Sequence, residues 1–335
     1  MSKYNWKVIE RQRAAGDSWA DIAAPLGSPS ATLRGAYYRW KKTQAGQVAE
    51  EPYSPVPAYV GGGAVILRSG ADNKFKFGVA GDKHIGSKYH RDDVLADLYR
   101  RFEQAGVDAV FDTGNWIDGD ARFNTHDVVV RGLDNQVSLM AEIHPRIEAP
   151  TYAVWGDDHE GWYAQREGID VGMYAAHRMR EAGHNWYDLG FMEAHVILEN
   201  SNTGERTRLF VMHPGGGSSY AYSYRPQKIV ESFEGGEKPA AVFMGHYHKL
   251  EALNIRNVWV LQSGCNQDQS TFMRKKSIDA HVGGAIVTLE QDPKTGALIG
   301  FAPEMLRYFN RGYYNGRWSY TGRPNRPARV INPAA

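Results

Sequence analysis

The stretch KFKFGVAGDKH, residues 74–84, joins a strand-like run to a polar end. The run KFKFGVAG is rich in aromatic and β-branched residues, which favour strands. Asp82 and His84 follow it directly. In open α/β sheets, functional sites assemble at the carboxyl ends of strands. This stretch therefore predicts a sheet with a site at the end of one of its strands.

Similar strand-like runs recur along the chain, with helical stretches between several of them. The helical stretches include residues 91–106 and 170–183. This alternation predicts an α/β layered domain. Near its end, residues 283–306 have the pattern of a hairpin. The further strand-like runs are residues 108–114, 150–156, 208–215, 240–248 and 258–264.

Five of these runs end in residue types that bind metals. Mixed imidazole and carboxylate donors suit Mn, Fe, Zn or Ni, whereas an all-oxygen set would indicate Mg or Ca. So many donors can hold two adjacent ions, which can clamp a phosphate and activate water. The pattern therefore predicts phosphoester hydrolysis. The residues are Asp82 and His84, Asn115 and Asp118, Asp157 to Glu160, His213, and His246 with His248.

The composition is that of an ordinary globular protein. The chain has 335 residues, of which 42% are hydrophobic and 23% charged. It has no apolar run near the ~18 residues that cross a bilayer, and its N-terminus lacks the apolar stretch of a signal peptide. The single cysteine, Cys265, excludes an internal disulfide and is expected to be a small buried residue. We expect a cytoplasmic protein without a membrane partner.

Charge is distributed unevenly along the chain. Residues 1–45 carry a net charge of +5 and residues 307–335 carry +6, which leaves −10 for the residues between them. Basic ends around an acidic middle suggest two contacts with a polyanion beside a centre that binds cations. Ordinary variation of surface charge is the alternative.

The pattern divides the chain into four parts. Residues 1–45 predict three short helices in a helix-turn-helix arrangement, capped near Asp17 or Ser18. Residues 46–72 are expected to be a linker, residues 73–306 a catalytic domain, and residues 307–335 a basic, aromatic C-terminal extension.

The last of the three N-terminal helices is the candidate DNA-binding element. In a helix-turn-helix domain this helix enters the DNA major groove. A small helical bundle used for protein contacts is the alternative. The candidate DNA-binding residues on or near its exposed side are Arg34, Arg39, Lys41 and Lys42.

As an ordered set, the polar strand ends resemble the motifs of the calcineurin-like metallophosphoesterase superfamily. Those motifs are D-x-H, G-D-x-x-D, G-N-H-D/E, a histidine, and G-H-x-H, and the resemblance covers residues 74–306. It implies a four-layer metallophosphoesterase β-sandwich flanked by helices, here with a small N-terminal all-helical domain. It also implies two divalent metal ions, Mn²⁺ first, with an activated hydroxide as the nucleophile.

The resemblance also implies a role for each matching residue. Asp82, His84 and His248 would hold one metal, and Asp158, His213 and His246 the other. Asn115 stands at the position that bridges the two. His159 would lie near the leaving group as a general acid. Asp118 and Glu160 would orient the ligands.

Two positions depart from the family pattern. Asn115 stands where the family has an aspartate, and Asp158 stands where it has an asparagine. The exchange keeps the number of carboxylates constant and moves their charge. An amide oxygen bridges metals poorly compared with a carboxylate, so the bridge is expected either to rest more on hydroxide or to be shared by Asp158. A degenerate, inactive site is the competing interpretation.

Loops that follow the candidate ligands are rich in aromatic and basic residues. Such mixtures suit single-stranded or frayed nucleic acid, because bases stack on rings and cations neutralise phosphates. Packing at the edge of the domain is the alternative. The candidate substrate-binding residues are Trp162, Tyr163, Arg166, Tyr220, Arg225 and Lys228.

Within the superfamily, the chain looks most like the DNA-repair exonuclease branch and like a phage-encoded member, whose location would be the host cytoplasm. Three functions stay open. The first is a two-metal nuclease acting on DNA, and the second is a phosphodiesterase or phosphatase for nucleotides or other small phosphoesters. The third is an inactive DNA-binding accessory protein. The sequence leaves the oligomeric state open, with a dimer as one option.

Overall fold

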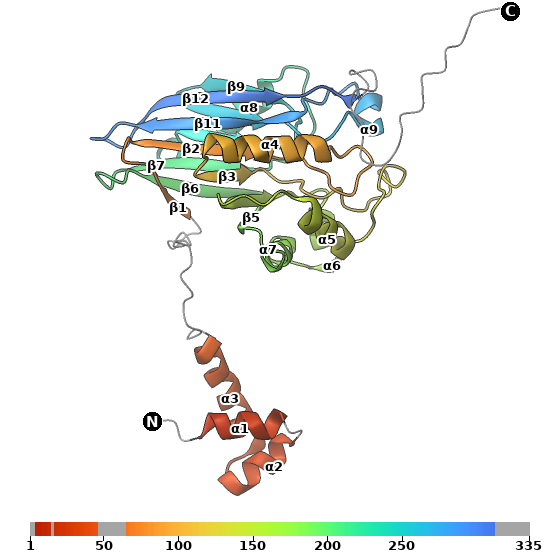
Figure 1. Cartoon of the computed structure of the whole chain (residues 1–335), viewed down its shortest axis with the longest axis vertical. Helices are drawn as coiled ribbons and strands as arrows, with labels where there is room; N and C mark the ends of the chain where they lie inside the picture. The colour runs from red at the N-terminus through yellow and green to blue at the C-terminus, as the bar shows by residue number, and fades with distance from the viewer. Residues whose placement is uncertain (1–3, 15–16, 46–64, 312–335) are drawn as a thin grey trace, which may run out of the picture. The chain divides into compact units, whose positions relative to one another are not determined.

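The computed structural model describes residues 4–14, 17–45 and 65–311. The chain divides into two compact units, Met1–Val56 and Pro57–Ala335. The first unit is helical and the second is a layered α/β unit (Figure 1). Within the described ranges, no helix combines the length and apolar character that crossing a bilayer requires.

The N-terminal unit is built from the three predicted helices. They are α1 (Trp6–Ala14), α2 (Trp19–Ala23), extended by the 3₁₀ turn η1 (Ala24–Leu26), and α3 (Ser30–Ala45). Ser18 caps α2, and its hydroxyl and the Asp21 carboxylate form a reciprocal capping box. Ile9, Ile22, Leu33 and Tyr37 form its buried core, with tryptophan rings packed around them.

The structure describes the side chain of one of the four candidate DNA-binding residues. Arg34 is exposed on α3. The side chains of Arg39, Lys41 and Lys42 lie outside the described part of the structure. DNA binding by this unit therefore stays a prediction.

The α/β unit contains two six-stranded sheets that face each other, as the four-layer sandwich requires. One sheet has the order β1-β6-β7-β8-β10-β9 and the other β12-β11-β2-β3-β4-β5. The bounds in the first sheet are β1 (Val65–Arg68), β6 (Glu193–Glu199), β7 (Arg206–Met212), β8 (Ala241–Met244), β10 (Val258–Ser263) and β9 (Leu250–Ile255). Those in the second are β12 (Leu298–Arg307), β11 (Gly283–Gln291), β2 (Lys74–Ala80), β3 (Ala109–Asp112), β4 (Thr151–Trp155) and β5 (Trp186–Phe191).

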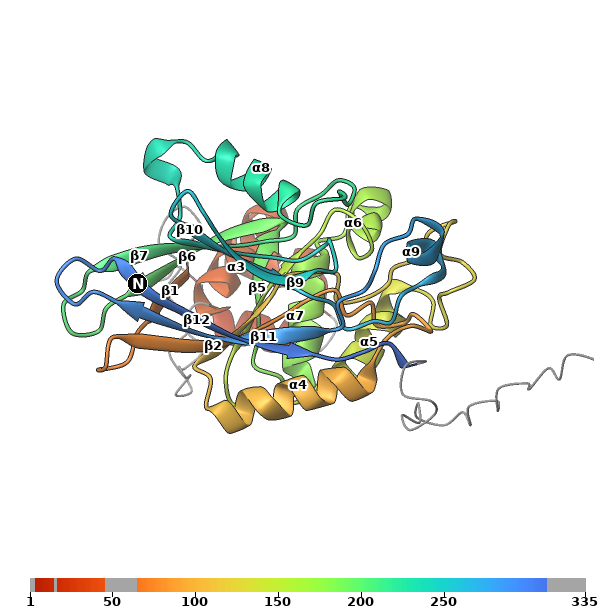
Figure 2. The same ribbon diagram turned by 90° about the horizontal axis from the view of Figure 1, so that it is seen from above.

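Helices cover the outer faces of both sheets. Figure 2 shows α4 and α8 on opposite sides of the strands. Side chains of α4, α5 and α7 pack with the outer face of the second sheet, and Val230 of α8 packs with that of the first. The helices are α4 (Asp92–Ala105), α5 (Leu133–Ile143), α6 (Gly161–Glu167), α7 (Val171–Glu181), α8 (Tyr224–Ser232) and α9 (Thr271–Lys275), with the 3₁₀ turn η2 (Gly235–Glu237).

Side chains alternate between the two faces of each strand, and this alternation explains why the sheet has a core on both sides. In β2, Phe75, Phe77 and Val79 face the core between the sheets, whereas Ala80 belongs to the core on the helix side. Gly78 also faces α4, and a Cβ at this position would lie 2.7 Å from the Phe102 ring. A glycine is therefore required there for the helix to approach the sheet.

The boundaries of the α/β unit differ from those predicted. Residues 65–68, assigned to the linker, form β1, which pairs in parallel with β6 and buries Val65 and Leu67. So short a strand beside a Gly-rich run carries too few alternating residues to be identified. At the other end, β12 reaches Arg307, and Arg311 binds Asp268, so residues 307–311 belong to this unit. Residues 69–72 of the predicted linker form the turn between β1 and β2, whereas residues 46–64 and 312–335 lie outside the described residues.

The hairpin prediction for residues 283–306 is confirmed. β11 pairs with β12 in antiparallel register from Gly283 with Arg307 to Gln291 with Leu298. β11 also pairs with β2, so the hairpin completes the second sheet next to the strand that leads to Asp82 and His84.

The Phe77 ring offers a test of the core between the sheets. It is fully buried, and its centroid lies 4.9 Å from that of Phe111 and 5.1 Å from that of Phe243 on the facing sheet. We expect Phe77→Ala to lower the free energy of unfolding by about 3–5 kcal/mol, because it leaves a cavity between the layers. Urea denaturation followed by circular dichroism measures this. The exposed Ile299 serves as control, since Ile299→Ala should cost less than about 0.5 kcal/mol. Equal losses in both variants would contradict the assignment of the core.

Candidate metal centre

The predicted ligands converge at the carboxyl ends of strands from both sheets. β2, β3 and β4 run parallel in one sheet, and β7 and β8 run parallel in the other. Asp82 and His84 follow β2, Asn115 follows β3, and Asp158 follows β4. His213 follows β7, and His246 and His248 follow β8.

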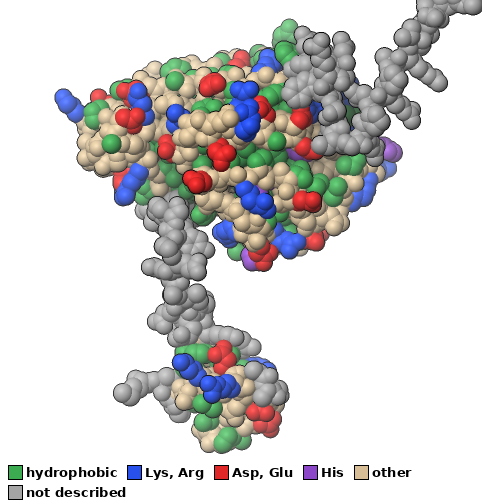
Figure 3. Space-filling view, viewed as in Figure 1, with side chains coloured by type: hydrophobic (Ala, Val, Ile, Leu, Met, Phe, Trp, Pro, Cys, Tyr) green, Lys and Arg blue, Asp and Glu red, His purple; other side chains and the backbone are tan. Residues whose placement is uncertain are grey.

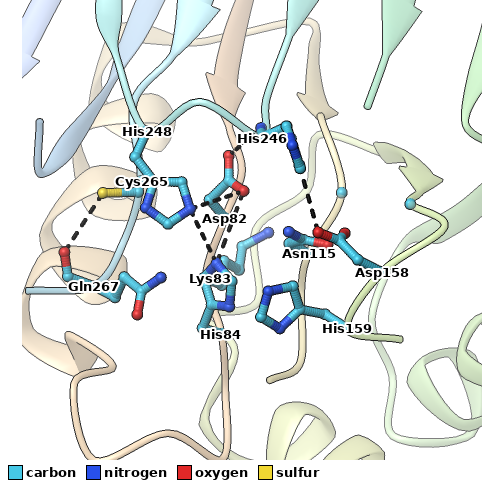
Figure 4. A network of polar contacts seen from close by, with 12 residues as sticks. Asp82, Lys83, His84, Asn115, Asp158, His159, His246, His248, Cys265 and Gln267 are labelled. Carbon is cyan, nitrogen blue, oxygen red and sulfur yellow. Dashed lines mark hydrogen bonds and ion pairs between the residues drawn. The ribbon is translucent and has the colours of Figure 1, made fainter. Parts of the chain in front are cut away.

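The first group of ligand-type side chains comprises Asp82, His84 and His248. Their donor atoms lie within 4.8 Å of one another. His248 Nε2 lies 3.3 Å from Asp82 Oδ1 and 3.2 Å from His84 Nε2. Figure 4 shows the three side chains pointing toward one another. All three are buried.

The second group comprises Asp158, His213 and His246. Asp158 lies 3.6 Å through one oxygen from His213 Nε2 and 3.6 Å through the other from His246 Nδ1. The donor atoms of this group also lie within 4.8 Å of one another. Asn115 lies beside Asp158 in Figure 4. The grouping is the one that the resemblance implied.

Three buried oxygens at the cluster, one in each group and one on Asn115, accept no hydrogen bond, although imidazole nitrogens lie 3.3 Å and 3.6 Å from the two carboxylate oxygens. They are Asp82 Oδ1, Asn115 Oδ1 and Asp158 Oδ1. An unpartnered polar oxygen in a protein interior costs several kcal/mol by transfer measurements. Bound cations would remove that cost, and a set of imidazole nitrogens and carboxylate oxygens suits Mn, Fe, Zn or Ni. The residues therefore fit divalent metal ions.

The second ring nitrogen of most histidines in the cluster is held by a hydrogen bond. His84 Nδ1 donates to Asp118 Oδ1 at 3.1 Å, and His213 Nδ1 donates to the Thr113 carbonyl at 2.6 Å. His246 Nε2 donates to the Gly216 carbonyl at 2.6 Å. Such bonds fix the tautomer and aim the other nitrogen at the metal position.

The electrostatics of the cluster reflect its buried carboxylates. Although burial alone would lower it, the pKa of His248 rises to about 10, mainly because of Asp82. Burial likewise opposes the rise in the pKa of His213 to about 9, which Asp158 and Asp82 cause. Burial raises the pKa of Asp118 to about 6. The buried carboxylates thus attract positive charge, which protons supply on His248 and His213 and which metal ions would supply when bound.

His159 stands at the edge of the first group. Its ring centroid lies 4.3 Å from that of His84, and its Nδ1 donates to the Asp118 carbonyl at 2.8 Å. Its Nε2 is thereby left toward the cavity, which His159 lines. The ring is half-buried, so it can contact both the metal site and a substrate.

Glu160 and Lys83 lie beneath the cluster. Glu160 Oε1 accepts a hydrogen bond from the backbone N–H of Asn115 at 2.8 Å and another from the backbone N–H of Gly156 at 3.1 Å. These two bonds connect the loop after β3 to the loop after β4. Lys83, between two ligands in sequence, is fully buried, and its ammonium contacts Asp112. Burial lowers the pKa of Lys83 to about 7. Sequence reasoning missed Lys83, although a lysine inside D-x-H was a visible signal.

Backbone conformation is unusual throughout the cluster. Several of its non-glycine residues have φ between 46° and 74°, a region that costs such residues about 1–3 kcal/mol each. Left-handed residues let the chain turn sharply off a strand and point consecutive side chains at one place. These residues are Asp82, His84, Asn115, His159, His246 and His248.

Glycines before the ligands make room for them. A Cβ at Gly156 would lie 2.5 Å from the His213 ring, and one at Gly245 would lie 2.9 Å from Asp82 Oδ2. Gly114, with φ of 96°, would place a Cβ 2.6 Å from His213 Nδ1. The glycines in these motifs are therefore required by close approach of the ligand side chains.

A cavity of about 1010 Å³ opens at the cluster. His84, Asn115, Asp158, His159, His246 and His248 all line it. Of the predicted substrate-binding residues, Tyr220 lines it and is fully exposed. Trp162 lies at its edge, where its ring packs on His159 with centroids 4.6 Å apart.

The structure does not bring the other predicted substrate-binding residues to this cavity. Tyr163 is buried on the inner side of α6, and its hydroxyl donates to Asp120 at 2.8 Å. Arg166 donates to the Asp120 carbonyl, and Lys228 pairs with Glu231 on the surface of α8. Arg225 lies against Gly216, beside a smaller hollow. Sequence proximity to a ligand does not tell which face of the following helix a residue occupies.

Several lining residues were not among the predicted sites. Phe123, Asn124 and Asp127 come from the loop after β3, and Lys249 and Lys276 supply the positive charge. Phe123 had a detectable signal, since it is an isolated aromatic residue in a polar loop. Cys265 is buried as expected, and its thiol lies 3.5 Å from the Gln267 carbonyl.

No protein-family model matches the chain, and no curated protein matches it. Among solved structures, an archaeal phosphodiesterase is 13% identical with a TM-score of 0.36, covering 69% of this chain and 100% of its own. Yfce, a phosphoesterase from E. coli, is 14% identical with a TM-score of 0.36, covering 68% and 98%. Vps29 from Entamoeba histolytica, solved with Zn²⁺, is 13% identical with a TM-score of 0.33, covering 70% and 99%.

The exchange of amide and carboxylate at Asn115 and Asp158 can be tested by metal content. We expect Asn115→Asp alone to perturb binding, because it adds a buried negative charge, and Asp158→Asn alone to weaken it. The double variant restores the charge and should bind metal more tightly than the worse single variant, by about tenfold or more. Titration of Mn²⁺ by isothermal calorimetry, with metal analysis after dialysis, measures this. A double variant no better than the worse single one would show that the two positions do not compensate.

Proposed function

We propose that the chain is a metal-dependent phosphodiesterase that holds two divalent ions. The observation that supports this most directly is the pair of adjacent ligand groups, with three buried oxygens that accept no hydrogen bond, at one cavity. Asp82, His84 and His248 would hold one ion, and Asp158, His213 and His246 the other. Asn115 would lie between them. Mn²⁺ is the first candidate, with Fe, Zn or Ni as alternatives.

Metal ions in such a site supply positive charge to a phosphoryl group and activate water. The chain's own residues have separate tasks. Asp118 holds His84 through Nδ1, and its backbone carbonyl holds His159. With Nδ1 fixed, the cationic form of His159 presents an N–H on Nε2 toward the cavity. This proton can pass to the oxygen that leaves phosphorus.

The charge of the cavity wall favours a diester over a monoester. The lining includes two lysines, and Lys249 is paired with Asp279. A phosphodiester brings one negative charge, whereas a monoester brings up to two, so outside the metal positions the diester meets less repulsion from the carboxylates. The acidic residues among the lining are Asp118, Asp127, Asp157, Asp158 and Asp279.

We further propose DNA as the polymer on which the enzyme acts. Exposed aromatic rings beside a phosphate site suit nucleic-acid bases. The N-terminal unit supports this proposal through its exposed Arg34 and the net charge of +5 of residues 1–45. On the face of the α/β unit in Figure 3, acidic and basic side chains are interspersed, without a large basic patch among the residues that are coloured there.

A nucleotide or another small phosphoester is the second candidate substrate. The cavity volume of about 1010 Å³ favours it, because this is at the upper end of the range found for small-molecule sites. The basic terminal segments would then serve another purpose. Substrate length separates the two candidates.

Hydrolysis with added Mn²⁺ tests the proposed activity. We expect cleavage of end-labelled single-stranded DNA, followed on denaturing gels beside a duplex and a small diester. His84→Ala should abolish cleavage, because it removes a ligand from the first group. Turnover of the small diester alone would favour the second candidate. No turnover of any substrate by metal-loaded protein would contradict the assignment as a phosphodiesterase.

Substitution of His159 separates proton transfer from metal binding. We expect His159→Ala to lower kcat by about 10²–10⁴-fold, because a general acid contributes that much. Its metal content should stay at the wild-type value. Substrates with leaving groups of low pKa, such as p-nitrophenol, should lose much less, since they leave without a proton. Equal losses on both kinds of substrate would show that His159 acts in another way.

A further inference from the structure

Two phenylalanine rings stand exposed in the wall of the metal cavity. Phe123 is 59% exposed and Phe272 is 46% exposed, and both line the cavity. Their centroids lie 5.6 Å apart with an interplanar angle of 47°. Large apolar rings normally lie inside a protein, so two neighbouring rings left in solvent beside a polar site indicate a surface for a ligand.

A series of ring contacts connects this surface to the candidate general acid. The Phe123 centroid lies 5.4 Å from that of Trp162, and the Trp162 centroid lies 4.6 Å from that of His159. His159 in turn contacts His84. The exposed rings therefore lie on the His159 side of the metal positions, which is the side where the leaving group would depart.

The loop that carries Phe123 is built on the metal site. Asn124 donates from Nδ2 to the Asp118 carbonyl at 3.2 Å and to Asp118 Oδ2 at 3.2 Å. Its Oδ1 accepts from the Ala121 amide at 2.9 Å. Asp118 is the residue that also orients His84 and His159. The hydrogen bonds of Asp118 thus fix the position of the Phe123 loop relative to His84 and His159.

The helix that carries Phe272 is anchored as firmly. Ser270 caps α9 by accepting from the Met273 amide, and Met273 is buried below it. The Tyr89 hydroxyl lies 2.7 Å from Thr271 Oγ1. The two rings therefore form a preorganised surface, which binds a planar ligand with little loss of side-chain entropy.

We propose that Phe123 and Phe272 form a stacking subsite for the base of a nucleoside leaving group. The inference rests on the proposed phosphodiesterase function and specifies which side of the scissile phosphate is recognised. Water adds its oxygen to phosphorus, and the P–O bond to the nucleoside breaks. The nucleoside oxygen takes a proton from His159, and water returns one to the ring. The products are a phosphate monoester and a nucleoside hydroxyl.

The neighbouring side chains favour a neutral base over other ring-bearing or apolar ligands. Five aspartates and two lysines line the cavity, so an anionic lipid surface or an acidic peptide would meet net negative charge, although Lys88 pairs with Asp127. Ser87, Gln267 and Ser270 offer hydrogen-bonding groups nearby. A nucleobase has an apolar face for the rings and a polar edge for these groups.

Dinucleotides with one abasic residue test this subsite. The substrates are thymidylyl-thymidine and its two analogues in which one or the other base is missing. The products identify which nucleoside leaves with a free hydroxyl in place of the phosphate. In the Mn²⁺ enzyme, we expect the analogue that lacks the base of this nucleoside to lose about 5- to 150-fold in kcat/KM, the factor that one stacked base supplies. A loss confined to the other analogue would overturn the assignment to the leaving group. In the Phe123→Ala, Phe272→Ala double variant, thymidylyl-thymidine should fall to the level of the analogue without the leaving base. The difference between the two substrates should then disappear.

Binding without turnover provides a second readout. Thymidine should change the fluorescence of Trp162, which contacts Phe123, whereas an abasic sugar should not. Trp162→Phe identifies this signal among those of the nine tryptophans. The double variant should lose the change and Phe123→Tyr should keep it. Val129→Ala, an exposed position in the same loop, is the matched control and should behave as the wild type.

Four other results would each contradict a different part of the proposal. Equal kcat/KM for all three dinucleotides, with activity intact, would overturn the subsite and leave the phosphodiesterase function standing. A loss in the double variant that is the same with and without the base would show that the rings support the site rather than stack. Binding of acidic vesicles or peptides, with no response to thymidine, would mean that the rings serve a macromolecular partner. Hydrolysis of no diester at all would instead refute the proposed function.

Discussion

Buried oxygens that accept no hydrogen bond are the constraint around which the α/β unit is arranged. Asp82, Asn115 and Asp158 each carry one. Holding such atoms together in an interior is unfavourable unless cations compensate them. The apolar core between the two sheets fixes the positions of the strand ends that carry these oxygens. Three parallel strands of one sheet end opposite two parallel strands of the other. The packing of the two sheets thus determines both the layers of the fold and the position of the site.

Around this cluster, hydrogen bonds determine orientation more than they add stability. Asp118 is the clearest case, since it contacts His84, His159 and Asn124. The Asp118 carboxylate therefore orients a candidate metal ligand and the loop that presents Phe123, and its backbone carbonyl orients the candidate general acid. Gly216 has a similar position on the other side, where its carbonyl accepts from His246 while its loop continues to Tyr220. In both places, the metal site and the cavity wall are positioned by the same residues.

The sequence predicted this arrangement unevenly, for physical reasons. Strand ends such as Asp82–His84 were identifiable because period and residue type agree there. The division of the ligands into two groups came from the family resemblance, because spacing along the chain says nothing about contacts between sheets. Tyr163 was misassigned because it follows a ligand yet faces the inside of α6. β1 was missed because its partner β6 lies more than a hundred residues away, and a short strand is defined by its partner.

The left-handed residues of the cluster have a consequence for how such a site persists in evolution. Glycine would relax the backbone at Asp82, His84 or His246, whose φ values are 46°, 49° and 74°. Each such change would ease folding of the metal-free chain while it removed a ligand. Variants selected only for expression or thermostability would therefore be expected to fold well and to lose the metal site. In this cluster, the stability of the metal-free chain and its capacity to hold ions therefore favour opposite residues.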